Sequence, residues 1–302
     1  MIVYKNLNIK KNHKGSVIAI GNFDGLHLGH QKVLKEAKKK AKKDKIKFGL
    51  ITFEPVPTMF FNKEIKNHRI NSMSQKIYFL KKNKLDFLII INFNESFSNL
   101  SAEDFIKKIL FKKLRSKYIF ISQNFKFGKK RLGNINILKN FEEKYLYKTV
   151  ITNPYKKKNK VTSSSLIRKI IYKGQVQEAK KLLNRFWCVE GEVVKGKQRG
   201  RKIGFPTCNI KLNSYTLPKL GVYSVWVKIN SLKKRGIANV GYRPTFNGKS
   251  LLLEVNIFGL NRNLYKKRLK ISFIKFIRAE KKFKNINQLK AQIKKDIIAA
   301  KK

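Results

Sequence analysis

Two histidines, His27 and His30, stand three residues apart in the stretch GNFDGLHLGH (21–30), although the chain of 302 residues has only four. At a helix start, residues three apart lie on one side of the first turn. Two imidazoles placed there can donate hydrogen bonds to phosphate oxygens as charge builds up in an in-line displacement. Zinc is an alternative, but it takes three or four ligands and no further His or Cys has a matching spacing. A pair of surface histidines is the other alternative.

Glycines frame the two histidines and indicate how they are held. Gly21, Gly25 and Gly29 surround a turn between a predicted buried strand over 16–23 and a predicted helix over 30–45. Glycine lets backbone N–H groups come close to a ligand, and the amino end of a helix favours an anion. The turn is therefore predicted to bind phosphate. Its candidate binding residues are Gly21, Phe23, Asp24 and Gly25.

A second stretch, TSSSLIR (162–168), supports phosphate binding. Ser163 and Ser164 can cap a helix and bind phosphate oxygens, and Arg168 can hold a leaving pyrophosphate through two hydrogen bonds. An ordinary serine cap with a solvated arginine is the alternative. Together the two stretches resemble the nucleotidylyltransferase superfamily, whose HxGH and SSxxxR-type motifs grip ATP and which releases pyrophosphate.

A glycine-rich stretch in the second half, GEVVKGKQRGRKIGFPTCNI (191–210), predicts a different phosphate site. It is no P-loop, because it lacks the GKS/T ending and no helix follows it. Backbone amides of such a loop can still wrap phosphates. Thr207 and Asn209, two apart on a strand, offer a hydroxyl and an amide oxygen that suit Mg²⁺ carried by ATP. A basic turn without a ligand is the alternative. The candidate residues for ATP and magnesium are Gly196, Gly200, Lys202, Thr207 and Asn209, with Thr207 as the metal contact.

Glu254 lies in the otherwise apolar stretch SLLLEVNIF, which predicts a strand. Burying a carboxylate costs on the order of several kcal/mol unless it is paired, so its position needs a reason. A general base that takes a proton from an alcohol attacking ATP is one reason. A charge on the solvent face of the strand, or a partner for a lysine, is the alternative that strand statistics favour.

The elements around these sites predict two kinds of architecture. In the first half strands and helices alternate, which predicts a parallel sheet covered on both faces with ligands beyond the carboxyl ends of its strands. From about residue 185 short strands separated by Gly, Pro and Asn predict an all-β fold, and a helix is expected over 285–302. A helical bridge over 163–184 joins the halves. The further predicted strands of the first half are 47–55, 86–93 and 117–122, and its further helices are 74–83 and 101–114.

Composition narrows the class of protein. An apolar content of 42% is enough for packed cores. The 71 Lys and Arg residues against 17 Asp and Glu give a formal charge of +54, which invites a polyanion partner. Because the lysines are spread along the whole chain together with abundant Asn and Ile, an AT-rich coding sequence explains them better than a nucleic-acid-binding face. A basic nucleic-acid-binding protein stays the alternative from another class.

Cysteine usage and hydropathy indicate the compartment. Two cysteines are too few for a disulfide framework, which favours a reducing, cytoplasmic environment. No apolar run approaches the roughly 20 residues of a bilayer crossing, so no membrane partner is expected. The amino-terminal residues lack the apolar core and cleavage site of a signal peptide. Nothing in the sequence indicates an oligomeric state.

The chain resembles the prokaryotic bifunctional riboflavin kinase/FAD synthetases nearly end to end. The matching stretches include IGNFDGLHLGHQ, SSSLIR, GRKIGFPTCNI, ANVGYRPTF and LEVNIF, in the family's order. The resemblance implies a Rossmann-like adenylyltransferase domain (1–184) and a six-stranded antiparallel β-barrel kinase domain with a C-terminal helix (185–302). The barrel would phosphorylate riboflavin to FMN with ATP and Mg²⁺. The first domain would then transfer AMP from ATP to FMN, giving FAD and pyrophosphate.

The resemblance also implies roles for single residues. His27 and His30 would stabilise the adenylyl transition state, and Glu254 would be the kinase base. Flavins would be substrate and product, with no tightly bound redox cofactor. By position in the family's motifs, the other expected contacts are Ser163, Ser164 and Arg168 for ATP phosphates, Thr207 and Asn209 for Mg-ATP, Asn124 in the adenylyltransferase, and Arg278 and Phe283 for the flavin.

Several positions depart from the family's pattern. Val56 replaces a histidine in TFEPVP, SQNFKFG lacks the acidic residues that usually precede FxFG, and Cys208 replaces an alanine in PTCN. The first two departures lie in the adenylyltransferase half. A riboflavin kinase whose adenylyltransferase domain has decayed is therefore an alternative to the bifunctional enzyme.

Overall fold

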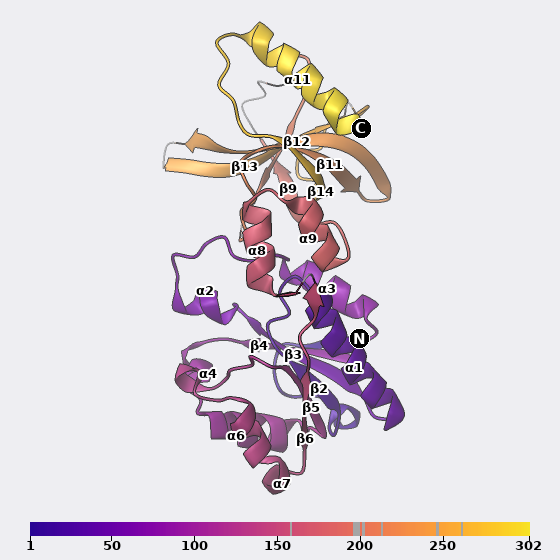
Figure 1. The fold of residues 1–302 in the computed structure, drawn as a ribbon, viewed down its shortest axis with the longest axis vertical. Coiled ribbons are helices and arrows are strands. Elements are labelled where there is room, and N and C mark those ends of the chain that lie inside the picture. Colours follow the sequence, from indigo (N-terminus) through magenta and orange to yellow (C-terminus); the bar gives the residue numbers. More distant parts are fainter. Residues whose placement is uncertain (158, 196–199, 201–202, 213, 246–247, 261) are drawn as a thin grey trace. The chain divides into compact units, whose positions relative to one another are not determined.

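The computed structural model describes residues 1–157, 159–195, 200, 203–212, 214–245, 248–260 and 262–302 (Figure 1). The chain forms two compact units. The first contains Met1–Lys66 and Met73–Ser163, and the second contains Asn67–Ser72 and Ser164–Lys302. The division into functional domains at 184/185 stays a prediction.

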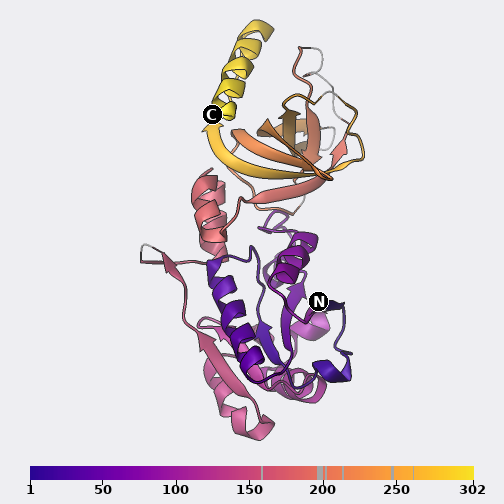
Figure 2. The ribbon, with the colours of Figure 1, turned by 90° about the vertical axis from the view of Figure 1, so that its right-hand side faces the viewer.

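The first unit is built on a parallel sheet with the strand order β1-β4-β3-β2-β5-β6. Its strands are β1 (Ile2–Tyr4), β2 (Val17–Ile20), β3 (Phe48–Glu54), β4 (Phe87–Asn92), β5 (Tyr118–Ser122) and β6 (Lys148–Thr152). Its α-helices are α1 (Leu28–Lys43), α2 (Pro57–Phe61), α3 (Met73–Lys82), α4 (Glu95–Ser98), α5 (Ala102–Asp104), α6 (Ile135–Asn140) and α7 (Glu142–Tyr145). Short 3-10 turns span Lys11–His13 and Lys129–Arg131, and β7 (Lys156–Lys157) and β8 (Lys160–Val161) form a ribbon that projects from the unit (Figure 2).

Both faces of this sheet are covered, as the apolar strand sequences predict. Alternate residues of β2 enter two separate cores: Val17 packs in a cluster with helices α1 and α3, and Ile18 packs in a cluster on the other face. The second cluster contains the helix that follows Ser101. A regular α-helix was expected there, but a π-helix runs from Phe105 to Lys113 after the short α5. The prediction of a doubly covered parallel sheet is confirmed.

The strand order reverses between β2 and β5, which makes the carboxyl ends of these two strands a topological switch point. From β2 the chain moves through β3 to β4 and then returns to β5 on the other side of β2. The carboxyl ends of β2 and β5 therefore flank the crevice in which open α/β sheets bind ligands. Residues 21–30 follow β2, and Asn124 follows β5. The topology brings the first predicted site to this edge.

The second unit is a closed six-stranded antiparallel barrel with helices, as predicted. The barrel order is β10-β13-β12-β11-β14-β9. Its elements are α8 (Ser164–Tyr172), α9 (Val176–Leu183), β9 (Cys188–Val194), β10 (Cys208–Lys211), β11 (Gly221–Ile229), β12 (Leu232–Thr245), β13 (Gly248–Ile257), β14 (Arg268–Arg278) and α11 (Ile286–Lys301). The expected C-terminal helix is α11, and α8 and α9 correspond to the expected helical bridge.

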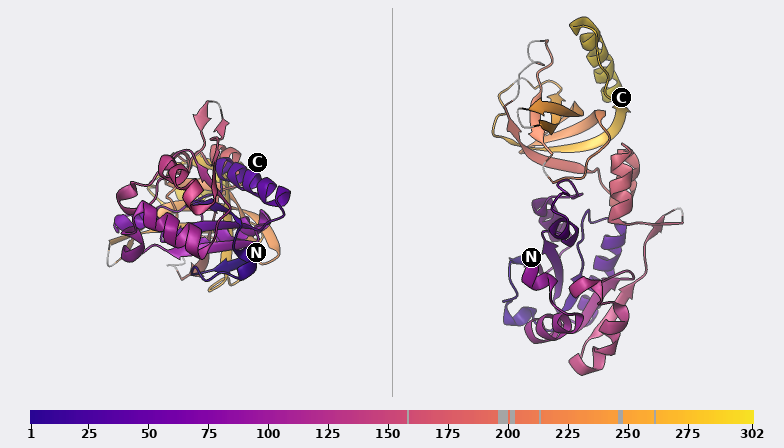
Figure 3. Two further views of the ribbon diagram at one scale, coloured as in Figure 1. Left: turned by 90° about the horizontal axis from the view of Figure 1, so that it is seen from below. Right: turned by 90° about the vertical axis from the view of Figure 1, so that its left-hand side faces the viewer.

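Helix α11 lies outside the barrel (Figure 3). Its residues Ile293, Ile297 and Ala300 pack with Val222 and Ile237 of the barrel wall. The last turn is also tied by hydrogen bonds, because Ser224 Oγ and the guanidinium of Arg235 both donate to the carbonyl of Ala300. Within the described residues, none of the helices combines the length and the apolar composition that a bilayer crossing requires.

A short segment from the first half of the sequence, 67–72, belongs to the barrel unit. Ile70 is fully buried in the barrel-side core, and its carbonyl accepts a hydrogen bond of 3.0 Å from the indole N–H of Trp187. The amide of Asn67 donates to the carbonyls of Leu212 and Tyr215 at 2.9 and 3.0 Å. This segment is six residues long and has no hydrophobic periodicity, so its sequence does not predict that it belongs to the barrel unit.

We predict that Ile70→Ala destabilises the barrel unit by on the order of 2–5 kcal/mol, because it leaves a cavity in a packed core. Both tryptophans of the chain, Trp187 and Trp226, lie in the second unit, so tryptophan fluorescence in urea follows that unit. Ile286→Ala, at a position that is 59% exposed, is the control and should change the stability by less than about 0.5 kcal/mol. An unchanged midpoint for Ile70→Ala would contradict the assignment of this segment.

Candidate active sites

The turn after β2 has a backbone that few side chains adopt. Phe23, Gly25 and Leu26 have φ angles of 46°, 83° and 39°. Positive φ at non-glycine residues costs of order 1–3 kcal/mol each and persists where the surroundings enforce it. Phe23 and Leu26 are both 2% exposed and anchor the turn in the core below α1. The turn is therefore held in one shape by packing.

The two histidines form one stacked pair at the start of α1. Their ring centroids are 3.7 Å apart and their planes differ by 19°. His27 is the N-cap residue, and its Nδ1 accepts the backbone N–H of His30 at 3.3 Å. Because Nδ1 is an acceptor, the neutral His27 ring carries its proton on Nε2, which is then a donor. The predicted placement of both histidines on one side of the first turn is confirmed.

Gly29 packs closely beside this pair. A Cβ at Gly29 would lie 3.1 Å from His27 Nδ1 and 3.3 Å from the carbonyl oxygen of Thr162. The start of the TSSSLIR stretch therefore lies next to the histidine motif, as the two motifs predict when they are read together. Ser163 ends the first unit, whereas Ser164 and Arg168 lie in α8 of the second. Their approach to the histidines stays a prediction.

An aromatic cluster lies on the same unit and was missed by the sequence analysis. Phe93 contacts Phe60, Phe61 and Phe97 at centroid distances of 5.3, 5.7 and 5.5 Å. The cluster comprises Phe53, Phe60, Phe61, Phe93, Phe97, Phe105, Phe125 and Phe127. Its members come from β3 and α2, from the residues after β4 and from the residues after β5, so the cluster lies towards the carboxyl ends of the strands. Phe61 is 68% exposed, so the cluster offers a face for stacking.

On the barrel, Asn209, Glu254 and Asn239 form a row across three neighbouring strands. Asn209 and Asn239 are the two cross-strand partners of Glu254. Residues directly opposite each other in a sheet project to the same face. Because Cys208, Leu253 and Val255 enter the barrel core, the row projects outward. Glu254 is half-buried, and its two cross-strand neighbours are amides. It is therefore neither a fully solvated charge nor a carboxylate in the core.

Asn209 has the property expected of a ligand-binding amide. It is only 6% exposed, and within the described part of the chain its Oδ1 has no hydrogen-bond partner. A buried oxygen without a partner costs about 1–3 kcal/mol, which a ligand can recover. Thr207, just before β10, is exposed, and a Cβ at Gly200 would lie 3.2 Å from its Oγ1. These are hard oxygen donors of the kind that suit Mg²⁺.

A pocket of about 500 Å³ opens beside Thr207. Its walls include Val193, Cys208, Val255 and Ile257 from the barrel and Leu260, Leu264 and Tyr265 from the connection between β13 and β14. Burial raises the pKa of the Cys208 thiol to about 12, so this wall stays uncharged at neutral pH. Thr207, Arg262 and Asn263 also line the pocket, so it combines apolar walls with several polar groups, as sites for small molecules do.

The comparisons with known proteins agree on both halves of the chain. The family described as FAD synthetase matches residues 9–166, and the family described as riboflavin kinase matches residues 183–302. A bifunctional riboflavin kinase/FMN adenylyltransferase of Buchnera aphidicola (Schizaphis graminum strain) is 43% identical over 98% of this chain and 96% of its own length. The protein of that name from Haemophilus influenzae is 36% identical over 95% and 94%. The chain belongs to the bifunctional riboflavin kinase/FMN adenylyltransferase family.

A solved structure shares this fold. A protein of Streptococcus pneumoniae whose crystal structure is titled macrolide-efflux protein is 32% identical, covers 99% of this chain and 98% of its own, and has a TM-score of 0.88. Its title names another activity, but both family matches and the curated relatives agree with one another. The prediction of a bifunctional enzyme is therefore confirmed over the two alternatives, a riboflavin kinase with a decayed adenylyltransferase domain and a nucleic-acid-binding protein.

Some of the remaining predicted site residues are described by the structure, and others are not. Gly196 and Lys202 lie outside the described residues. Asn124 is exposed after β5, at the ligand edge of the sheet, and Asp24 is buried in the turn. Val56, where the family usually has a histidine, is 4% exposed at the start of α2 and adds only apolar packing there. The binding roles of all these residues stay predictions.

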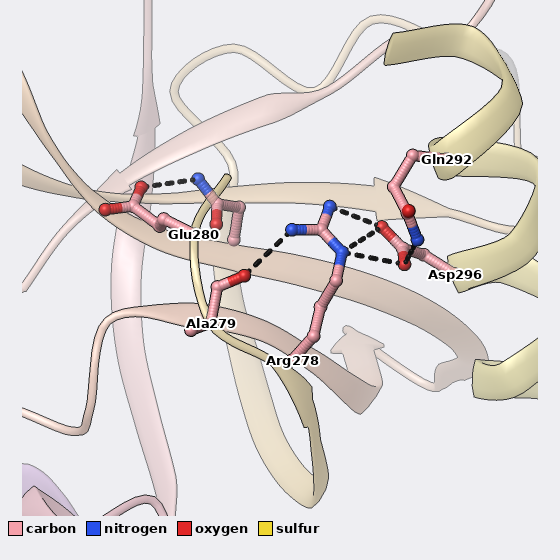
Figure 4. A network of polar contacts seen from close by, with 6 residues as sticks. Arg278, Ala279, Glu280, Gln292 and Asp296 are labelled. Atoms are coloured by element: carbon pink, nitrogen blue, oxygen red, sulfur yellow. Dashed lines mark hydrogen bonds and ion pairs between the residues drawn. The ribbon is translucent and has the colours of Figure 1, made fainter. Parts of the chain in front are cut away.

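Arg278, a predicted flavin contact, is held by the C-terminal helix (Figure 4). Its Nε and Nη2 donate to the carboxylate of Asp296 at 2.6–3.0 Å, and Gln292 donates to the same carboxylate at 2.9 Å. The other predicted flavin contact, Phe283, has its ring centroid 5.8 Å from the Arg278 guanidinium. The structure thus assigns Arg278 a part in anchoring α11, and its flavin contact stays a prediction.

The carboxylate of Glu280, which is labelled in Figure 4, accepts a hydrogen bond of 3.4 Å from the amide of Asn239, which adds a second carboxylate beside the row. A Cβ at Gly241 would lie 2.2 Å from the same carboxylate oxygen. Gly241 is therefore needed for the close approach of Glu280. In the sequence the ANVG motif is only one of the stretches that match the family, whereas the register of β12 with β13 places its Asn and Gly beside Glu254.

We predict that Asp296→Asn lowers the stability of the barrel unit by about 3 kcal/mol, because it leaves the mostly buried Arg278 charge without its carboxylate. Urea unfolding followed by tryptophan fluorescence measures the change. Arg268→Gln is the matched control: its pair with Glu190 has an N–O distance of 3.8 Å and the Arg268 side chain is 65% exposed, so a change below about 1 kcal/mol is expected. Equal effects of the two substitutions would contradict the anchoring role.

Proposed function

We propose that the chain makes FAD from riboflavin in two steps, each at its own ATP site. The barrel unit phosphorylates riboflavin to FMN, and the first unit joins AMP from a second ATP to FMN with release of pyrophosphate. The observation that supports the proposal is that one chain has two unlike arrangements suited to phosphate chemistry: the stacked His27–His30 pair at a helix start, and the cross-strand Asn209–Glu254 pair on the barrel. The reactions take place in the cytoplasm.

In the kinase step, the apolar walls of the pocket take the adenine ring, and the triphosphate lies beside Thr207. The Asn209 Oδ1 and the Thr207 hydroxyl are the oxygens that would hold Mg²⁺ with the phosphates. Bound there, the metal would neutralise phosphate charge. Glu254 takes the proton of the ribityl hydroxyl as its oxygen attacks the γ-phosphorus, and the bond to ADP breaks. The strand register places Asn209 and Asn239 on either side of this carboxylate.

In the adenylyltransferase step, an oxygen of the FMN phosphate attacks the α-phosphorus of ATP and pyrophosphate leaves. The proton on His27 Nε2 and the ring of His30 stabilise charge on the α-phosphate in the transition state. Ser163, Ser164 and Arg168 bind the β- and γ-phosphates. The exposed side of the aromatic cluster, around Phe61, stacks the flavin ring. No side chain has to act as acid or base, because the attacking phosphate is already ionised.

We predict reciprocal losses for His27→Asn and Glu254→Gln. Asparagine keeps an N-cap acceptor but removes the imidazole, so FAD formation from supplied FMN should fall by about 10²–10³ while FMN formation persists. Glu254→Gln removes the base and should lower FMN formation by about 10²–10⁴ while FAD formation from FMN persists.

Chromatographic separation of riboflavin, FMN and FAD over time measures both rates in each variant. The wild-type chain should convert riboflavin first to FMN and then to FAD. Loss of both activities in either variant would mean that the substitution acts through folding, and an unaffected kinase rate in Glu254→Gln would remove Glu254 from its role.

A further inference from the structure

A lysine is buried directly beneath the turn that follows β2. Lys76, on α3, is 3% exposed. Its ammonium donates to the backbone carbonyl of Asn22 at 2.8 Å and approaches the hydroxyl of Thr52 at 3.2 Å. Thr52, which is fully buried on β3, donates to the same Asn22 carbonyl at 3.0 Å. Three elements of the first unit thus meet at one carbonyl oxygen.

This carbonyl controls the orientation of the strained turn. In a trans peptide the C=O and the following N–H point in opposite directions, so fixing the Asn22 carbonyl toward Lys76 turns the N–H of Phe23 away from it. Phe23 is the first of the positive-φ residues, and its ring contacts the ring of His30 at a centroid distance of 4.9 Å. The peptide that Lys76 holds is therefore one residue from a side chain that packs on the histidine pair.

Burying an ammonium is costly, and simple packing does not explain it. Desolvation of such an ion costs several kcal/mol, and an apolar side chain of the same length would fill the space without that cost. What the lysine adds is a charged donor to a carbonyl, together with a positive charge on the protein side of an anion site. Both contributions act on the turn that contains Gly21, Asp24 and Gly25.

We propose that Lys76 is a positioning residue of the FMN adenylyltransferase, which keeps the turn over residues 21–26 in the shape that binds the ATP triphosphate. The inference rests on the proposed function of this site and adds a residue from another helix to it. Lys76 acts through the Asn22 carbonyl and the shape of the turn. Its removal should therefore raise the KM for ATP and lower the rate of FAD formation, while the kinase site on the barrel is unaffected.

The test compares Lys76→Met, Lys76→Arg and the control Lys81→Met, a substitution at an exposed lysine of the same helix. Methionine fills the space without the charge, so FAD formation from FMN should fall at least 100-fold with a raised KM for ATP. FMN formation by the same sample should stay within twofold. Arginine keeps a charged donor, so Lys76→Arg should form FAD at least tenfold faster than Lys76→Met. Lys81→Met should match the wild type.

Hydrogen exchange gives a readout that does not depend on activity. In Lys76→Met the amides of residues 22–31 should exchange at least tenfold faster than in the wild type, while those of β2 and β4 keep their protection. FAD formation within threefold of the wild type, unchanged exchange over 22–31, or loss of protection throughout the sheet would each overturn the proposal. If the wild type makes no FAD from FMN, the proposed function fails, and the exchange comparison still decides whether Lys76 shapes the turn.

Discussion

The proposed kinase site depends on the hydrogen-bonded register of β10, β13 and β12. That register places Asn209 and Asn239 on either side of Glu254, with all three side chains outside the barrel. Because side chains alternate along a strand, a slip by one residue would turn Glu254 into the core and replace it outside with an apolar neighbour. The closed barrel prevents such a slip, since every strand is paired on both sides and the inward residues fill one core. The chemistry of the site is thus a consequence of barrel packing.

The other site is built by a different means. A turn cannot be held by a ladder of strand pairs, and here it is held by two buried apolar anchors, Phe23 and Leu26, and by polar contacts to its backbone. Gln31 donates to the Leu26 carbonyl at 2.9 Å, and Thr52 and Lys76 donate to that of Asn22. Backbone strain and fixed carbonyls are what a preorganised phosphate site needs, because the amides must already point at the ligand.

Much of this architecture could be predicted because its signals are local. Apolar strands alternating with helices specify the covered parallel sheet, and short strands divided by Gly and Pro specify the barrel. The histidine pair was found because two residues three apart at a helix start must meet. Glu254 was different: its own strand favoured a solvated charge over a general base, and only the resemblance reversed that preference. The two asparagines that flank it lie on other strands, and the register between strands cannot be predicted from one stretch of sequence.

The features that sequence reasoning missed depend on distant contacts. The aromatic cluster brings together phenylalanines that follow three different strands, so no single window of sequence contains it. The π-helix over Phe105–Lys113 was expected to be an α-helix, because one wider turn shifts the apolar pattern by only a residue. Lys76 is one of 71 Lys and Arg residues, and nothing in the sequence around it distinguishes a buried lysine from a solvated one.

The segment 67–72 has a consequence for how this enzyme can be divided. The two matched families meet in the sequence between residues 166 and 183, but the folded barrel unit also contains a piece of chain that begins at Asn67. The polypeptide therefore passes from one unit to the other three times, and no single cleavage separates two complete units. A protease nick or a gene fission at the family boundary would leave the kinase fragment without the residue that covers Trp187. The two family regions follow one another in the sequence, but the folded barrel unit also includes residues 67–72, which lie within the first of these regions.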